Sequence, residues 1–197
     1  MKTLLLGTNN PGKIEELRSL LGDMQGWQLL SPSDIDLHLN IDETGTSYRA
    51  NALIKARAYS KASGLITITD DSGLEVKALN DAPGLFSARY SPKKNANAAD
   101  RRQFLINQLR DHPQPWFARF VSTVCLLTLD GNEIFAEGEC LGEIIGQERG
   151  DFGFGYDPVF LLSETQKTMA ELNMQAKNSL SHRARAISTI KAQLQSL

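Results

Sequence analysis

Hydrophobic and polar positions in the first half of the chain follow a repeating order of strand and helix. Residues 4–6 form a short apolar run typical of a buried strand, and apolar residues recur at helical spacing over residues 11–21. A second helix is predicted over residues 47–62, followed by a β-branched strand over residues 65–69. We expect the acidic residues that come next to form a turn before an alternating strand at 74–79. This order is βαβ-like.

The second half of the chain has a different pattern. A third helix is predicted over residues 98–110, and two long strands over 117–129 and 133–140 meet at the turn sequence Asp130-Gly131-Asn132, which indicates a hairpin. Apolar residues at helical spacing mark a last helix near residue 190. The two halves together predict an α/β fold, with a mixed sheet flanked by helices. We expect one domain of two lobes over residues 1–197, with a substrate cleft between the lobes.

Composition narrows the class of protein. Of 197 residues, 41% are hydrophobic and 22% are charged, and the formal net charge is -2. These values describe a globular protein without the basic excess that duplex binding requires, so no nucleic acid partner is expected. The two cysteines lack the spacing of zinc or thioredoxin-like sites, and free thiols suit a reducing cytoplasm. The apolar run at residues 1–7 is too short for a signal peptide or membrane span, so we expect a cytoplasmic protein with no membrane partner.

A phosphate-binding loop is predicted between the first strand and the first helix. Gly7 to Lys13 follow a strand and open a helix, where backbone N–H groups and the helix dipole attract an anion. Lys13 alone is ordinarily a solvated lysine, but a cation in the first helical turn opposes the dipole, and a bound phosphate removes that conflict. The loop matches the Walker A pattern except at Ile14, where Mg²⁺ needs Ser or Thr, and Pro11 lacks an N–H. Carboxylates elsewhere must then hold Mg²⁺.

Two acidic pairs are candidates for that role. Asp70-Asp71 follows a predicted strand, and Asp42-Glu43 precedes the second helix. Alone, the first pair is ordinarily a turn and the second is equally well a helix cap. Beside a phosphate loop they predict a Mg²⁺ site, because Mg²⁺ binds carboxylate oxygens and usually arrives with phosphates. On the second helix, Asn51 and Lys55 lie one turn apart and face either water or the cleft.

Groups suited to a flat ligand occur later in the chain. Residues 150–158 interleave glycines with aromatic residues, which lets backbone and ring approach a flat ligand, although a tight bend with core aromatics has the same pattern. Lys177, His182 and Arg183 lie around the start of the last helix. Singly they suit a solvated surface, and as a set they offer donors to carbonyl or phosphate oxygens.

Eight short motifs follow one another along nearly the whole chain. They are Thr8-x-Asn10-x-x-Lys13, Glu43-Thr44-Gly45, Asn51-Ala52-x-x-Lys55-Ala56, Asp70-Asp71-Ser72-Gly73-Leu74, Ala82-Pro83-Gly84, Ser87-Ala88-Arg89-Tyr90, Phe154-Gly155-Tyr156-Asp157 and Ser181-His182-Arg183. Each is weak by itself, but in this order they resemble the inosine/xanthosine triphosphate pyrophosphatase family. The resemblance implies an elongated α/β fold with a central cleft, a homodimer, Mg²⁺ dependence, and hydrolysis of the non-standard purine triphosphates ITP, dITP and XTP. The products would be the monophosphate and pyrophosphate, a reaction that cleans the nucleotide pool.

The resemblance also implies roles for single residues. Asp71 would be the catalytic proton acceptor, and Asp42 and Asp71 would hold Mg²⁺, with help from Glu43 and Asp70. The implied substrate-binding residues are Thr8, Asn9, Asn10, Pro11, Gly12 and Lys13 for the triphosphate, Ser72, and Phe154, Gly155, Tyr156, Asp157, Lys177, His182 and Arg183 for the base. Cationic donors suit the 6-oxo acceptor of hypoxanthine or xanthine. If adenine bound instead, its 6-amino group would face these donors, a mismatch that costs about 1 to 3 kcal/mol of binding free energy.

Our hypothesis is that a water activated by Asp71 and Mg²⁺ attacks the α-phosphorus, while Lys13 and the loop amides stabilise the departing pyrophosphate. Two alternatives stay open: a non-catalytic nucleotide sensor, which has no need of a base, and a P-loop NTPase releasing orthophosphate, which Ile14 opposes.

Asn9 departs from the family pattern, which has Gly there, and Asn is one of the few other residues that tolerate a positive φ.

Overall fold

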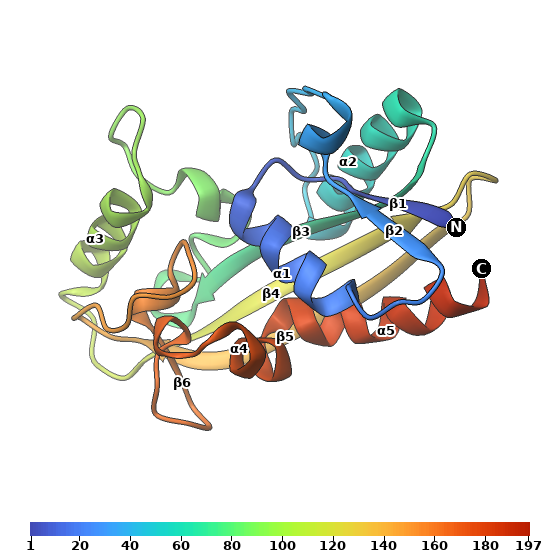
Figure 1. Ribbon diagram of the computed structural model, residues 1–197. Helices are drawn as coiled ribbons and strands as arrows, with labels where there is room; N and C mark the ends of the chain where they lie inside the picture. Colours follow the sequence, from blue (N-terminus) through green and yellow to red (C-terminus); the bar gives the residue numbers. More distant parts are fainter. The chain divides into compact units, whose positions relative to one another are not determined.

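The computed structural model describes residues 1–197 and confirms an α/β fold with a mixed sheet (Figure 1). Six strands form the sheet in the order β2-β1-β3-β4-β5-β6. β1 pairs in parallel with β2 and β3, whereas β5 and β6 are antiparallel. The strands are β1 (Lys2–Leu6), β2 (Trp27–Leu30), β3 (Ile66–Val76), β4 (Trp116–Leu127), β5 (Glu133–Ile144) and β6 (Phe160–Leu162).

Helices flank this sheet. The α-helices are α1 (Pro11–Leu21), α2 (Tyr48–Ser63), α3 (Ala98–Leu109), α4 (Met174–Leu180) and α5 (His182–Ser196). Short 3-10 helices are η1 (Pro32–Ile35), η2 (Lys77–Leu79), η3 (Gly84–Arg89), η4 (Asp157–Val159) and η5 (Met169–Glu171). None of the helices is both long enough and apolar enough to cross a lipid bilayer.

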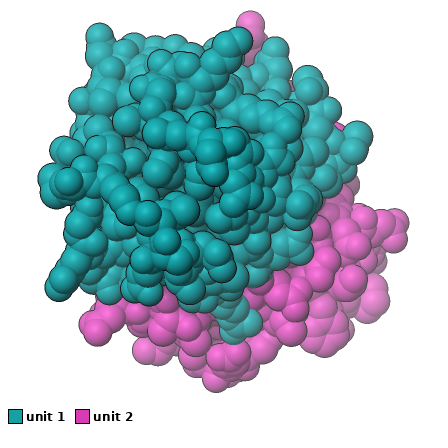
Figure 2. All heavy atoms as spheres, turned by 90° about the vertical axis from the view of Figure 1, so that its right-hand side faces the viewer, with its two compact units in different colours: residues 1–71, 122–138, 182–197 teal, residues 72–121, 139–181 magenta.

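The chain divides into two compact units (Figure 2). Unit 1 comprises residues 1–71, 122–138 and 182–197, and unit 2 comprises residues 72–121 and 139–181. The three long strands β3, β4 and β5 therefore each contribute one part to each unit.

Strand alternation gives the sheet of unit 1 two different faces. On one face, Ile68 and Val124 pack with apolar residues of α1 and α5. On the other face, Cys125 and Leu127 pack with Ala52 of α2. Because successive residues of a strand point to opposite faces, the polar residues at the end of this part of β3 are also divided between the two faces.

Unit 2 has a core of its own, built largely from aromatic and branched side chains. Leu74 of β3, Leu105 of α3 and Tyr156 contribute to it. The rings of Phe120 and Phe160 pack with centroids 4.4 Å apart. This core supports the glycine-aromatic segment that precedes β6.

The predicted turn at the acidic residues was wrong. β3 runs without interruption from Ile66 to Val76, and residues 77–79, expected as the end of a second strand, form η2. Asp, Ser and Gly favour turns because their side chains or backbone can satisfy local hydrogen bonds. In this chain the carboxylates of Asp70 and Asp71 bond to other elements instead, so the backbone stays extended.

Gly138 in β5 allows a close approach of α5, and we expect Gly138→Ala to destabilise the protein. A Cβ at residue 138 would lie 2.1 Å from the His182 carbonyl oxygen and 2.7 Å from the Ala186 nitrogen. Overpacking of this kind costs about 1–3 kcal/mol, which urea unfolding measures. Gly146→Ala is the control, because the nearest atom to its added Cβ is 4.0 Å away. Equal free energies of unfolding for the two variants would contradict the close approach.

Candidate active site

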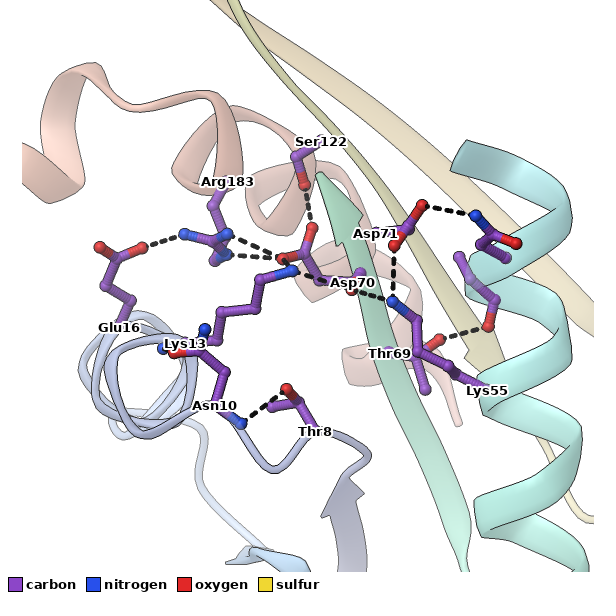
Figure 3. Close-up of polar contacts among 12 residues, drawn as sticks. Thr8, Asn10, Lys13, Glu16, Lys55, Thr69, Asp70, Asp71, Ser122 and Arg183 are labelled. Carbon is purple, nitrogen blue, oxygen red and sulfur yellow. Dashed lines mark hydrogen bonds and ion pairs between the residues drawn. The ribbon is translucent and has the colours of Figure 1, made fainter. Parts of the chain in front are cut away.

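The loop between β1 and α1 places Lys13 in the first turn of the helix (Figure 3). Asn10 caps the helix, since its side-chain oxygen accepts a hydrogen bond from the Lys13 N–H at 3.2 Å, and its own N–H donates to Thr8 Oγ1 at 3.2 Å. Lys13 Nζ lies 2.9 Å from Asp70 Oδ2 and 3.2 Å from the Asp70 carbonyl oxygen. Burial lowers the pKa of the Lys13 ammonium, and Asp70 opposes this effect. The negative charge of Asp70 therefore offsets the repulsion between the Lys13 ammonium and the positive end of the helix dipole.

Asp70 is a buried carboxylate with partners from three elements. Arg183 of α5 donates to Asp70 Oδ2 from Nε and Nη2 at 3.0 and 2.8 Å, and Ser122 of β4 donates to Oδ1 at 2.5 Å. Arg183 also pairs with Glu16 of α1 (Figure 3). Burial alone would raise the pKa of Asp70, but the charges of Arg183 and Lys13 hold it well below its ordinary value. Asp70 thus stays ionised and joins α1, β3, β4 and α5.

Asp71 points to the opposite face of the sheet, toward α2 (Figure 3). Lys55 Nζ lies 2.7 Å from Asp71 Oδ1 and 2.7 Å from Glu43 Oε1. Asn51 donates to Asp71 Oδ2 at 3.3 Å, and its oxygen accepts from the Gly45 N–H at 2.8 Å. The polar pair on the second helix therefore faces the acidic residues. Burial raises the pKa of the Asp71 carboxyl, and Lys55 opposes this effect.

Among the four predicted metal ligands, the surroundings of Asp71 and Glu43 fit Mg²⁺ best. One cationic group, the Lys55 ammonium, already bridges their oxygens. Both Asp70 oxygens accept from basic or hydroxyl groups, and Asp42 is exposed in a segment without regular structure. No group of three His, Cys, Asp or Glu side chains forms a metal cage. This arrangement suits Mg²⁺, which usually binds one or two carboxylates together with substrate phosphates and water.

In unit 2, the predicted base-binding residues Phe154, Asp157 and Lys177 contact one another. Asp157 Oδ2 accepts from the Phe154 N–H at 2.8 Å and from Lys177 Nζ at 2.5 Å, and Lys177 Nζ lies 4.9 Å from the Phe154 ring centroid. Gly153 has a φ of 74°, and a Cβ there would lie 2.1 Å from Asp157 Oδ2. The glycine is therefore required for the loop to wrap around this carboxylate.

The remaining predicted residues have more varied surroundings. Tyr156 is in the core of unit 2, where its hydroxyl donates to the Ser87 carbonyl oxygen at 3.0 Å. His182 and Arg183 are buried at the start of α5 in unit 1. The Asn9 side chain donates to the Leu39 carbonyl oxygen at 3.2 Å.

The tolerance of asparagine for a positive φ is not used at Asn9. Asn9 is not among the residues with positive φ. Its side chain instead links the phosphate loop to residues 36–46, the segment that carries Glu43.

Sequence reasoning missed Glu16 and Ser122, the two polar partners of the Asp70 and Arg183 pair. Glu16 is three residues after Lys13 and therefore near it on the helix surface, which was the available signal. Ser122 carries no such signal, because it is one hydroxyl residue within a long predicted strand.

Comparisons with known proteins find relatives of this chain over nearly its whole length. The sequence model of the Ham1 family matches residues 4–193. The chain is 45% identical over 195 residues to the dITP/XTP pyrophosphatase of Mannheimia succiniciproducens, covering 97% of each chain. It is 42% identical to the dITP/XTP pyrophosphatase of Haemophilus influenzae, covering 97% of this chain and 98% of that one. A Ham1 protein structure from Coxiella burnetii, 36% identical, superposes with a TM-score of 0.88 over 100% of both chains.

We expect Arg183→Met to destabilise the protein by about 3–5 kcal/mol, because it leaves the buried carboxylates of Asp70 and Glu16 without their shared partner. Urea unfolding at neutral pH measures the change. Arg185→Met is the matched control, since Arg185 is an exposed arginine two residues further along α5. Wild-type stability in Arg183→Met would show that the ion pairs do not hold unit 1 together.

Proposed function

The chain belongs to the Ham1 family, and from this premise we propose that it hydrolyses the non-standard purine triphosphates dITP, XTP and ITP to the monophosphate and pyrophosphate. The observation that carries the proposal is the buried Asp71 carboxylate. Lys55 pairs with both Asp71 and Glu43. The strand that carries Asp71 also carries Asp70, which pairs with Lys13. A carboxylate whose pKa is raised by burial is suited to accept a proton.

We assign the triphosphate to the loop between Thr8 and Lys13. The N-terminus of α1 attracts anions. When substrate binds, the Lys13 ammonium leaves Asp70 and donates to a phosphate oxygen instead. Asp71 accepts a proton from the attacking water. The new bond joins the water oxygen to the α-phosphorus while the bond to the bridging oxygen of the β-phosphate breaks. Lys13 and the loop amides stabilise the negative charge on the departing pyrophosphate.

Mg²⁺ is the proposed cofactor; Asp71 and Glu43 would hold it, with Asp42 from the same segment as a further ligand. When bound, it neutralises phosphate charge. Lys55 bridges the two carboxylates, and its flexible four-carbon stem would let the ammonium move aside for the metal. Asp70 keeps Arg183 and Ser122 as partners when Lys13 turns to the phosphate.

The base is assigned to Phe154, Asp157 and Lys177, which contact one another in unit 2. The Phe154 ring provides a stacking surface, and Lys177, held by Asp157, is a donor for the 6-oxo group. The resemblance adds His182 and Arg183 to this set. In unit 1 the Arg183 side chain is 2% exposed and is paired with Asp70 and Glu16, so we give it the role of fixing Asp70. A homodimer, implied by the resemblance, and a cytoplasmic location, inferred from the two free thiols, complete the proposal.

The released product tests the proposed function. We expect pyrophosphate from ITP, dITP and XTP with Mg²⁺, much slower release from ATP, and none after chelation of Mg²⁺. An assay that detects pyrophosphate and orthophosphate separately makes the measurement. Orthophosphate as the first product would favour a P-loop type of hydrolysis, and nucleotide binding without turnover would favour a sensor.

We expect Asp71→Asn to keep the fold and to lower kcat by about 10²–10⁴-fold, because asparagine has nearly the same shape but cannot accept the proton. Pyrophosphate release under saturating ITP measures kcat, and thermal unfolding verifies the fold. Asp23→Asn is the control, since Asp23 is an exposed carboxylate paired with Lys191. Near-normal turnover in Asp71→Asn would remove Asp71 from the proposed mechanism.

A further inference from the structure

The segment 148–157, which carries four of the predicted base-binding residues, contains no helix or strand before η4 begins at Asp157. Three of its residues, Gly150, Gly153 and Gly155, have φ angles of 83°, 74° and 62°. Glycine adds conformational freedom to the chain, so a segment of this composition needs contacts from elsewhere to keep one conformation.

Arg102 of α3 supplies such contacts through a single guanidinium. Its Nη1 donates to the Gly155 carbonyl oxygen at 2.8 Å, while Nε and Nη2 donate to the two carboxylate oxygens of Glu148 at 2.9 and 2.8 Å. The Arg102 side chain is 12% exposed, so its bond to Gly155 is partly shielded from water, whereas the Glu148 side chain is 45% exposed. The rigid fork of the guanidinium thus ties both ends of the segment to α3.

Gly155 lies between the residues assigned to the base. Phe154 precedes it, and Asp157 follows two residues later and accepts from the Phe154 N–H and from Lys177. A shift of the Gly155 carbonyl would therefore displace the Phe154 ring relative to the Lys177 ammonium that lies over it.

We propose that Arg102 is a positioning residue for base recognition, an inference that rests on the proposed function. Arg102 holds the Gly155 carbonyl and thereby orients Phe154 and Asp157 without touching the substrate. Glu148 acts only through Arg102, by fixing the plane of the guanidinium. Lysine replaces Arg102 only in part, because one ammonium cannot reproduce the planar fork that contacts Glu148 and Gly155 together.

The test compares Arg102→Met, Arg102→Lys, Glu148→Ala and the double variant Arg102→Met with Glu148→Ala. Steady-state pyrophosphate release gives kcat and KM for ITP. Competition by inorganic tripolyphosphate, which has no base, reports on the phosphate region alone.

We expect Arg102→Met to raise the KM for ITP about 10-fold, as for loss of a charged hydrogen bond, with kcat and tripolyphosphate inhibition near wild type. Arg102→Lys should be intermediate. The double variant should match Arg102→Met, because Glu148 acts through Arg102.

Arg110→Met is the matched control, since it removes an exposed arginine at the end of the same helix and should leave KM unchanged. Three results would overturn the inference: an unchanged KM in Arg102→Met, a parallel loss of ITP and tripolyphosphate binding, or effects of Arg102→Met and Glu148→Ala that multiply. If Arg102→Met does not unfold cooperatively, Arg102→Lys decides by the same criteria. If the wild type releases no pyrophosphate, the proposed function fails, and calorimetric binding of ITP to wild type and Arg102→Lys decides the role of Arg102.

Discussion

The arrangement of unit 1 depends on the burial of the Asp70 carboxylate. β3 brings Asp70, α5 brings Arg183, and α1 brings Glu16 and Lys13. A buried charge without a partner costs several kcal/mol, and in this network two acids and two bases neutralise one another. The elements must lie where these groups meet, so the network also orients α1 and the predicted phosphate loop at its N-terminus.

Strand alternation divides the adjacent acids between two tasks. Asp70 points toward α1 and α5, where its oxygens are engaged, and Asp71 points toward α2, where Lys55 and Glu43 surround it. A shift of β3 by one residue would exchange the two environments. Asp70, which pairs with Lys13, therefore has a different task from Asp71, whose surroundings suit a base or a metal ligand.

Local signals predicted α1 well and β3 poorly. The first helix begins and ends as expected, because its N-cap, its apolar face and the glycine after it are all encoded within one short segment. At Asp70 and Asp71 the local preference for a turn is overridden by bonds to distant residues. The short strands β2 and β6 went unpredicted, because four or three residues cannot establish a periodic pattern.

By itself, the sequence determined the enzyme family through the order of its motifs, and it predicted a phosphate loop without the Walker Mg²⁺ ligand and carboxylates to take that ligand's place. Only the tertiary structure decided which charged groups meet. Arg183 is 113 residues from Asp70 and 167 residues from Glu16. At such separations sequence spacing says nothing about contact, because these groups meet only when α1 and α5 pack on the same face of the sheet.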